Sequence, residues 1–289
     1  MPEIVFVIPA RNIDTLHRSL SMLSFQKGGG VSAVVVDFAG SDAVRSTVAD
    51  FEHRLPVSIK IMAQEGQPLW KCCLDSAPGA EWVCFITPGV ELMEKSVMRM
   101  RKCIDKHPAF DAFRWNLAEP ARKWGLKTSP DRLFLRIFED GDATPLSSFV
   151  FRAQTLREAF GADPDAAGMA PAIILSAAKK TGVRTVRWER VGYNAPAPSS
   201  DPAMVEKEVR SRLAFFRWSE RYFGEEYPMG VGDRLDLFAH ELSRLYPSFT
   251  PDELKEDLNT FAVVNGPIRR VRAASALKAA LKERQESLK

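Results

Sequence analysis

Short unbroken runs of branched apolar residues recur along the first ninety positions of the chain. They cover residues 4–8, 31–38 and 82–86, and such runs are typical of strands buried on both faces of a parallel sheet. Between the first two, residues 15–25 place three leucines at helical spacing, and Asp14 is expected to cap that helix.

Helices over residues 42–52 and 69–77 and a strand over 57–62 complete a regular alternation of strand and helix. This pattern predicts an α/β fold with a mostly parallel, doubly wound sheet flanked by helices. Ligands of such sheets bind at the carboxyl ends of the strands.

The pattern becomes less regular after residue 92. We expect helices over 96–106, 155–160 and 171–180, and strands over 109–117, 133–138, 148–152 and 184–190. Residues 194–202 are rich in Pro, Ala and Ser and resemble a linker. Four helical segments follow, at 205–223, 233–246, 251–261 and 267–288, so the chain divides into an α/β domain, 1–195, and a C-terminal helical extension, 196–289.

The charge balance is close to neutral. Forty Lys and Arg against 37 Asp and Glu leave a net charge of +3, which argues against a nucleic-acid partner. The last expected helix is basic. We expect it to be a solvated helix, and peripheral contact with a membrane surface is the alternative.

Targeting and redox features predict a soluble cytoplasmic protein. The four cysteines lack zinc-site spacing and fit reduced, structural thiols. No signal peptide is expected, and no stretch approaches the ~20 apolar residues of a transmembrane span.

Four stretches carry a resemblance to a known family. They are Val-Ile-Pro-Ala-Arg-Asn at 7–12, Val-Val-Asp-Phe-Ala-Gly-Ser-Asp at 35–42, residues 64–75, and Glu-Trp-Val-Cys-Phe-Ile-Thr-Pro at 81–88. In this order they resemble family 2 glycosyltransferases of the GT-A fold, over residues 3–92 and more faintly to about 195.

The resemblance implies a site for a UDP- or GDP-linked sugar. Pro9 and Arg11 would line the base with their backbone, Asp37 would bind the base or ribose, and Lys71 would approach the diphosphate. Turn formation by Asp37, helix capping by Asp42 and an ordinary surface position for Lys71 remain open alternatives. Phe38 stands where the family has a second acid.

The family's metal motif is degenerate in this chain. An Asp-x-Asp sequence would hold Mg or Mn against the diphosphate, but the strand at 82–86 is followed by Thr-Pro-Gly-Val. Glu91 is the nearest acid and is a candidate metal ligand, although it is also a natural helix start. We therefore expect a metal-free or weakly metal-dependent site.

The catalytic-base motif is degenerate as well. Phe151 and Arg152 resemble the segment that precedes it, but the following helix starts with Gly-Met-Ala-Pro at 168–171. Asp163 or Asp165 would then supply the base from the preceding loop, although acids beside a proline commonly form turns. Loop acids at Glu119, Asp131 and Asp140 are further candidates.

These features leave three hypotheses. The first is a glycosyltransferase that moves a sugar from a nucleotide donor to a glycan or polymer precursor. The second is a non-catalytic module of the same fold that binds or scaffolds in a glycan-assembly pathway. The third, a nucleotidyltransferase, is disfavoured because a glycine- and arginine-rich phosphate loop is absent near residue 1.

Overall fold

The structure, a computed structural model, describes residues 1–62, 67–87, 90–117, 125–129, 133, 137, 145–193, 215 and 218. Met1–Pro196 forms one compact unit and Ala197–Lys289 another. In the second unit, Phe215 and Trp218 are helical, and their rings stack with centroids 6.0 Å apart. The expected tail helices otherwise lie outside the described residues.

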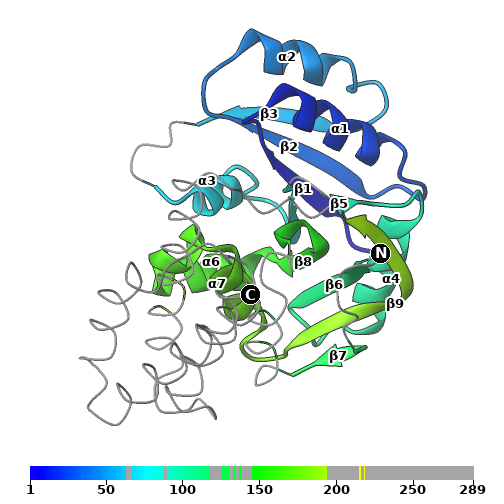
Figure 1. Cartoon of the computed structure of the whole chain (residues 1–289), viewed down its shortest axis with the longest axis vertical. Helices are drawn as coiled ribbons and strands as arrows, with labels where there is room; N and C mark the ends of the chain where they lie inside the picture. The colour runs from blue at the N-terminus through cyan, green and yellow to red at the C-terminus, as the bar shows by residue number, and fades with distance from the viewer. Residues whose placement is uncertain are drawn as a thin grey trace, which may run out of the picture. The chain divides into compact units, whose positions relative to one another are not determined.

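A nine-stranded mixed sheet forms the centre of the first unit (Figure 1). The strand order is β3-β2-β1-β4-β8-β6-β9-β5, with β7 paired to β9. The first four strands are mutually parallel, as predicted, and so are β6 and β9, whereas β8 runs antiparallel to both β4 and β6. The strands are β1 Ile4–Pro9, β2 Val31–Asp37, β3 Val57–Ile61, β4 Trp82–Phe85, β5 Val90–Glu91, β6 Ala112–Leu117, β7 Lys127–Thr128, β8 Phe149–Arg152 and β9 Val183–Tyr193.

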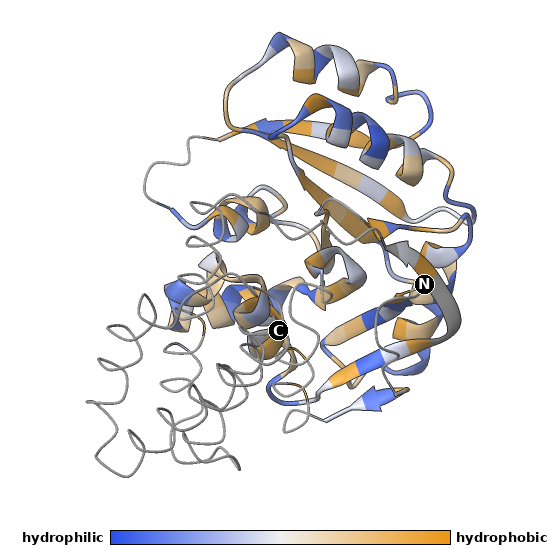
Figure 2. Ribbon diagram, in the orientation of Figure 1, coloured by the Kyte–Doolittle hydropathy of each residue, from blue (hydrophilic) through white to orange (hydrophobic). Residues whose placement is uncertain are grey.

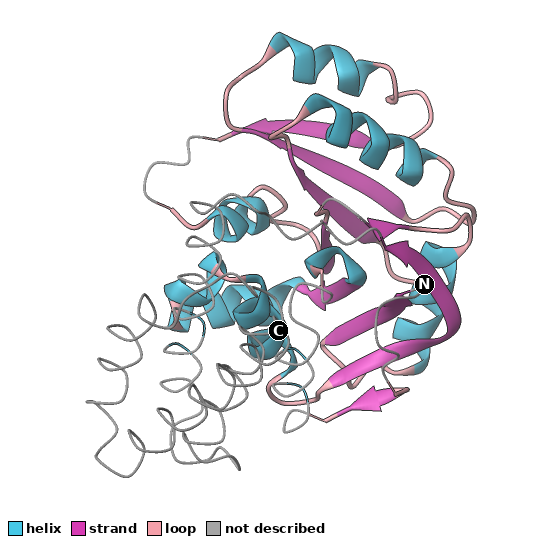
Figure 3. Ribbon diagram, in the orientation of Figure 1, coloured by secondary structure: helices cyan, strands magenta, loops and turns pink. Residues whose placement is uncertain are grey.

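Helices flank the sheet. Figure 3 shows α1 and α2 together over one face of β1, β2 and β3. The helices are α1 Ile13–Ser24, α2 Asp42–Ala49, α3 Leu69–Asp75, α4 Ser96–Lys106, α6 Ala153–Ala162 and α7 Ala170–Ala178, with short 3₁₀ turns η2 Leu146–Ser148 and η3 Pro164–Gly168.

The core under α1 follows the leucine spacing of the sequence. Leu16, Leu20 and Leu23 are buried in one cluster with alternate residues of β1 and β2, such as Phe6 and Val35. Figure 2 shows β1 and β2 largely hydrophobic, whereas α1 carries both kinds of residue. Burial of large apolar side chains of this kind contributes roughly 1.5–3 kcal/mol each.

Three local predictions are wrong. Asn12, not Asp14, caps α1, because its Oδ1 accepts a hydrogen bond of 3.0 Å from the Thr15 amide. Ser41, not Asp42, is the N-cap residue of α2, so Asp42 is the first helical residue. Of the strand expected over 133–138, the described Leu133 and Ile137 are both helical.

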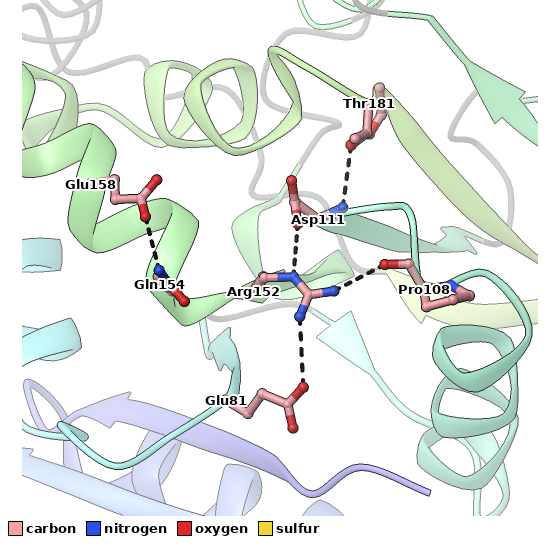
Figure 4. Close-up of polar contacts among 8 residues, drawn as sticks. Glu81, Pro108, Asp111, Arg152, Gln154, Glu158 and Thr181 are labelled. Atoms are coloured by element: carbon pink, nitrogen blue, oxygen red, sulfur yellow. Dashed lines mark hydrogen bonds and ion pairs between the residues drawn. The ribbon is translucent and has the colours of Figure 1, made fainter.

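Arg152 joins the parallel and mixed parts of the sheet (Figure 4). Its Nε lies 2.8 Å from Asp111 Oδ1, its Nη2 donates to the Pro108 carbonyl at 3.1 Å, and its Nη1 lies 3.7 Å from Glu81 Oε1. The guanidinium also lies over the Trp82 ring, 4.6 Å from its centroid. Residues before β4 and β6 are thereby held at the end of β8.

Candidate functional site

The carboxyl ends of β1, β2 and β4 lie at one edge of the sheet. Their alignment extends beyond the strands, because the Ala10 amide donates to Val36 at 2.9 Å and the Ile86 amide donates to Val7 at 2.9 Å. Pro9 is half-buried at this edge and Arg11 is exposed. The segments expected to line a nucleotide base therefore lie where a doubly wound sheet binds its ligand.

Asp37 organises the loop that follows β2. The side chain is 1% exposed, and its Oδ1 accepts hydrogen bonds from the amides of Ala39 and Gly40 at 2.9 and 3.0 Å, while Oδ2 accepts from Ser41 at 2.7 Å. Three of the roughly four acceptor positions of a carboxylate are thus used by main chain. Asp37 fixes the loop at the sheet edge, and its buried carboxylate offers little surface to a ligand.

Lys71 lies on α3 and is already paired. Its Nζ lies 2.6 Å from Asp75 Oδ2, one helical turn along, and both side chains are partly exposed. The neighbouring Trp70 is half-buried, with its ring centroid 5.3 Å from that of Phe85 on β4. A phosphate group at Lys71 would compete with the Asp75 carboxylate.

Arg11 is an exposed, positively charged residue at this edge. Within the described part of the chain its guanidinium has no hydrogen-bond or ion-pair partner. Burial, with the neighbouring Cys72 thiol, raises the pKa of Cys73 from 9.0 to about 12, and the charge of Arg11 acts in the opposite direction. Arg11 therefore lies within electrostatic reach of α3 and is free to bind an anion.

Thr87, which follows β4, is held by a different part of the chain. Its hydroxyl and that of the buried Ser147 lie 2.7 Å apart, and the Ser147 hydroxyl also lies 3.3 Å from the Thr87 carbonyl. These residues are 60 positions apart, and no local sequence signal indicated Ser147.

Glu91, the candidate metal ligand, does not belong to a metal-binding group among the described residues. Glu91 is exposed on β5, which pairs with β9, and the described residues contain no group of three His, Cys, Asp or Glu placed to share an ion. Hard divalent cations require several oxygen ligands, and one carboxylate beside Thr87 does not provide such a set. Glu119, Asp131 and Asp140 lie outside the described residues.

Asp163 and Asp165 lie at the turn η3. Asp163 Oδ1 accepts a hydrogen bond of 3.2 Å from the Asp165 amide; Asp163 is half-buried and Asp165 exposed. The turn packs against α3 as well as α6 and α7. The structure thus brings the candidate bases beside the helix that carries Lys71, while Glu91 lies on β5.

Solved structures that share this fold include complexes with nucleotides and nucleotide sugars. TarS 1–349 of S. aureus in complex with UDP is 14% identical, with a TM-score of 0.55 over 86% of this chain and 73% of that one. The same protein with UDP-GlcNAc is 13% identical, with a TM-score of 0.56 over 97% and 81%. The chain has a glycosyltransferase fold.

A second structure widens the comparison. Mannosyltransferase PcManGT from Pyrobaculum calidifontis, in complex with GDP-Man and Mn²⁺, is 13% identical, with a TM-score of 0.53 over 98% of this chain and 87% of that one. No protein-family model matches the sequence, and no curated protein matches it. At these identities the likeness concerns the fold.

No helix among the described residues has the length and apolar character needed to cross a bilayer.

Proposed function

We propose that this protein binds a nucleotide-diphosphate sugar at the carboxyl edge of β1, β2 and β4 and transfers the sugar to a glycan or polymer precursor. The observation that carries the proposal is the unpartnered Arg11 guanidinium at this edge, in a fold shared with structures that contain UDP-GlcNAc and GDP-Man. A planar guanidinium matches the oxygens of a phosphate with two parallel hydrogen bonds.

The proposed reaction breaks the bond between the anomeric carbon and the diphosphate and forms a bond from that carbon to an acceptor hydroxyl oxygen. The nucleoside diphosphate leaves with the electron pair, and Arg11 stabilises its charge, assisted by Lys71 when Lys71 exchanges Asp75 for phosphate. Asp163 or Asp165 accepts the hydroxyl proton. Their turn packs on α3, which favours these residues over acids on β5.

The described residues do not provide a coordination shell for Mg or Mn. We therefore assign the neutralisation of the diphosphate charge to the side chains of Arg11 and Lys71.

One observation favours a second candidate function. Thr87 hydrogen-bonds with Ser147 at the position where the resemblance implies a metal-binding acid. A non-catalytic module that binds nucleotide sugars within a glycan-assembly pathway is therefore the alternative.

Calorimetric titration of UDP, GDP, UDP-GlcNAc and GDP-Man, with and without Mn²⁺, tests the donor site. Arg11→Ala is expected to weaken binding by roughly 10- to 100-fold, because a charge-assisted bidentate contact is lost. Arg11→Lys should recover part of the affinity. Arg54→Ala is the matched control, because Arg54 bonds its neighbour His53 and lies on another loop.

The outcomes separate the hypotheses. Donor binding with release of nucleoside diphosphate in the presence of acceptor supports the enzyme, and Asp163→Asn with Asp165→Asn should then remove turnover while leaving binding. Donor binding with no turnover against any acceptor supports the non-catalytic module. Absence of nucleotide binding to the wild-type protein contradicts both.

A further inference from the structure

A cavity of about 510 Å³ opens between α1 and β5; Thr87 lines it, whereas Arg11, Asp37, Lys71 and η3 do not. This volume falls within the range of small-molecule sites. Its lining combines charged, hydroxyl and apolar groups. Among them are His17, Arg18, Met22 and Phe25 on the α1 side, and Thr87 and Glu91 on the β5 side.

The two walls of the cavity are fastened to each other. The end of α1 and the residue after β5 meet through the Leu92 amide, which lies 3.2 Å from Met22 Sδ. Beyond the helix, Lys27 forms an ion pair with Glu94, and its amide donates to the Glu94 carbonyl at 2.7 Å. The Val97 amide donates to the side-chain oxygen Oε1 of Gln26 at 3.2 Å. The cavity is therefore preformed, which lowers the entropic cost of ligand binding.

The charged groups of the cavity are available. Glu91 and Arg18 are exposed, and among the described residues neither has a hydrogen-bond or ion-pair partner. Gly192 lies opposite Glu91 in the β5–β9 pair, and a Cβ there would come within 3.2 Å of Glu91 Cβ and 3.4 Å of Oε2. The glycine leaves room for the carboxylate beside β9.

This combination matches a saccharide. Glu91 accepts hydrogen bonds from sugar hydroxyls, Arg18 donates to sugar oxygens, and Phe25, which is 65% exposed, offers an aromatic face to the apolar side of a sugar ring. Thr87 connects the cavity to the end of β4, because it lines the cavity and is the second residue after that strand.

We propose that the cavity between α1 and β5 binds a saccharide, with Glu91, Arg18 and Phe25 as its contacts. Its assignment to the acceptor chain rests on the proposed transferase function, since a chain bound there would reach the donor edge past Thr87. Saccharide binding itself follows from the cavity and does not require turnover.

Capture of the full-length protein on a printed panel of oligosaccharides tests this site. The wild-type protein should retain at least one saccharide, and Glu91→Gln and Phe25→Ala should each reduce capture at least 10-fold. Gly192→Ala should reduce it less, because it displaces the Glu91 side chain by a few tenths of an ångström. Glu52→Gln, an exposed acid outside the cavity, should bind like the wild type.

The proposal is overturned if the wild-type protein captures no saccharide, or if the cavity variants bind as well as Glu52→Gln does. Thermal melts of every variant exclude unfolding as the cause of a loss. Titration of UDP and GDP into the same wild-type preparation keeps the two proposals apart. Nucleotide binding without saccharide capture removes the saccharide site alone, whereas capture without nucleotide binding removes the donor site alone.

Discussion

At the scale of single residues, Asp37 shows how a residue suited to ligand recognition serves the loop instead. Its carboxylate holds three amides while only 1% exposed. We predict that Asp37→Ala lowers the free energy of unfolding by about 2–4 kcal/mol, because hydrogen bonds to a buried charge are lost. Urea unfolding measures this; a loss as small as that of the exposed Asp42→Ala would contradict the structural role.

The buried thiols predict an alkaline sensitivity. Burial raises the pKa of Cys73 from 9.0 to about 12 and raises that of Cys84 as well. The folded protein keeps these protons where the unfolded chain has lost them, so the stabilisation is complete below pH 9 and falls as pH rises toward 12.

Unfolding in urea between pH 8.5 and 10.5 measures this effect. Cys73→Ala should flatten the loss of stability by up to about 1.4 kcal/mol per pH unit, the value for one proton. An unchanged slope in the variant would show that Cys73 does not contribute to the pH dependence.

Capping residues illustrate the limit of sequence reasoning at this scale. Asn12, Asp14 and Thr15 all lie within four positions, and each is a residue type that caps helices. Which of them does so depends on where β1 ends and the backbone turns into the helix. The same ambiguity separates Ser41 from Asp42. The sequence pattern predicted both helices, whereas identifying the capping residue required the backbone geometry of the structure.

At the scale of elements, Arg101 on α4 links the turn before β2 to the N-terminus through hydrogen bonds to both segments. The 8% exposed guanidinium donates to the carbonyls of Met1, Pro2, Gly28 and Gly29 at 2.5–3.1 Å. A Cβ at Gly30 would overlap this guanidinium, whereas a Cβ at Gly29 would meet no atom within 4 Å.

Gly30→Ala and Gly29→Ala therefore form a matched pair, because the two glycines have φ of +68° and +64°. Both substitutions carry the cost of a left-handed backbone, but only Gly30→Ala displaces Arg101. We expect Gly30→Ala to be less stable than Gly29→Ala by about 1–3 kcal/mol in chemical denaturation. Equal losses would show that Arg101 moves aside without cost.

The predictability of elements follows the length of their buried runs. The strands β1, β2 and β4 were evident because they are buried on both faces. The segment Leu-Phe-Leu-Arg-Ile-Phe at 133–138 has the same composition, yet Leu133 and Ile137 are helical. Short apolar runs do not distinguish strand from helix, and no local pattern indicates that β8 enters antiparallel.

At the scale of the whole first unit, the order of motifs predicted that β1 and β2 end at the same edge of the sheet, but not which side chains at that edge are already paired. The family resemblance implies that Lys71 approaches the diphosphate and gives Arg11 only a backbone role beside the base, whereas the structure shows Lys71 paired with Asp75 and the Arg11 guanidinium without a partner among the described residues. The contact of Thr87 with Ser147 spans 60 positions, so it depends on tertiary folding.

The most direct measurement of the central claim is amide hydrogen exchange of the full-length protein with and without saturating UDP or GDP. The account predicts slower exchange at three separated segments, residues 10–12, 38–41 and 69–75, because one nucleotide would cover all three. The groove formed by residues 56–58 and 76–80 at the opposite ends of the strands should be unaffected. No change at the three segments, or protection confined to that groove, would contradict the account.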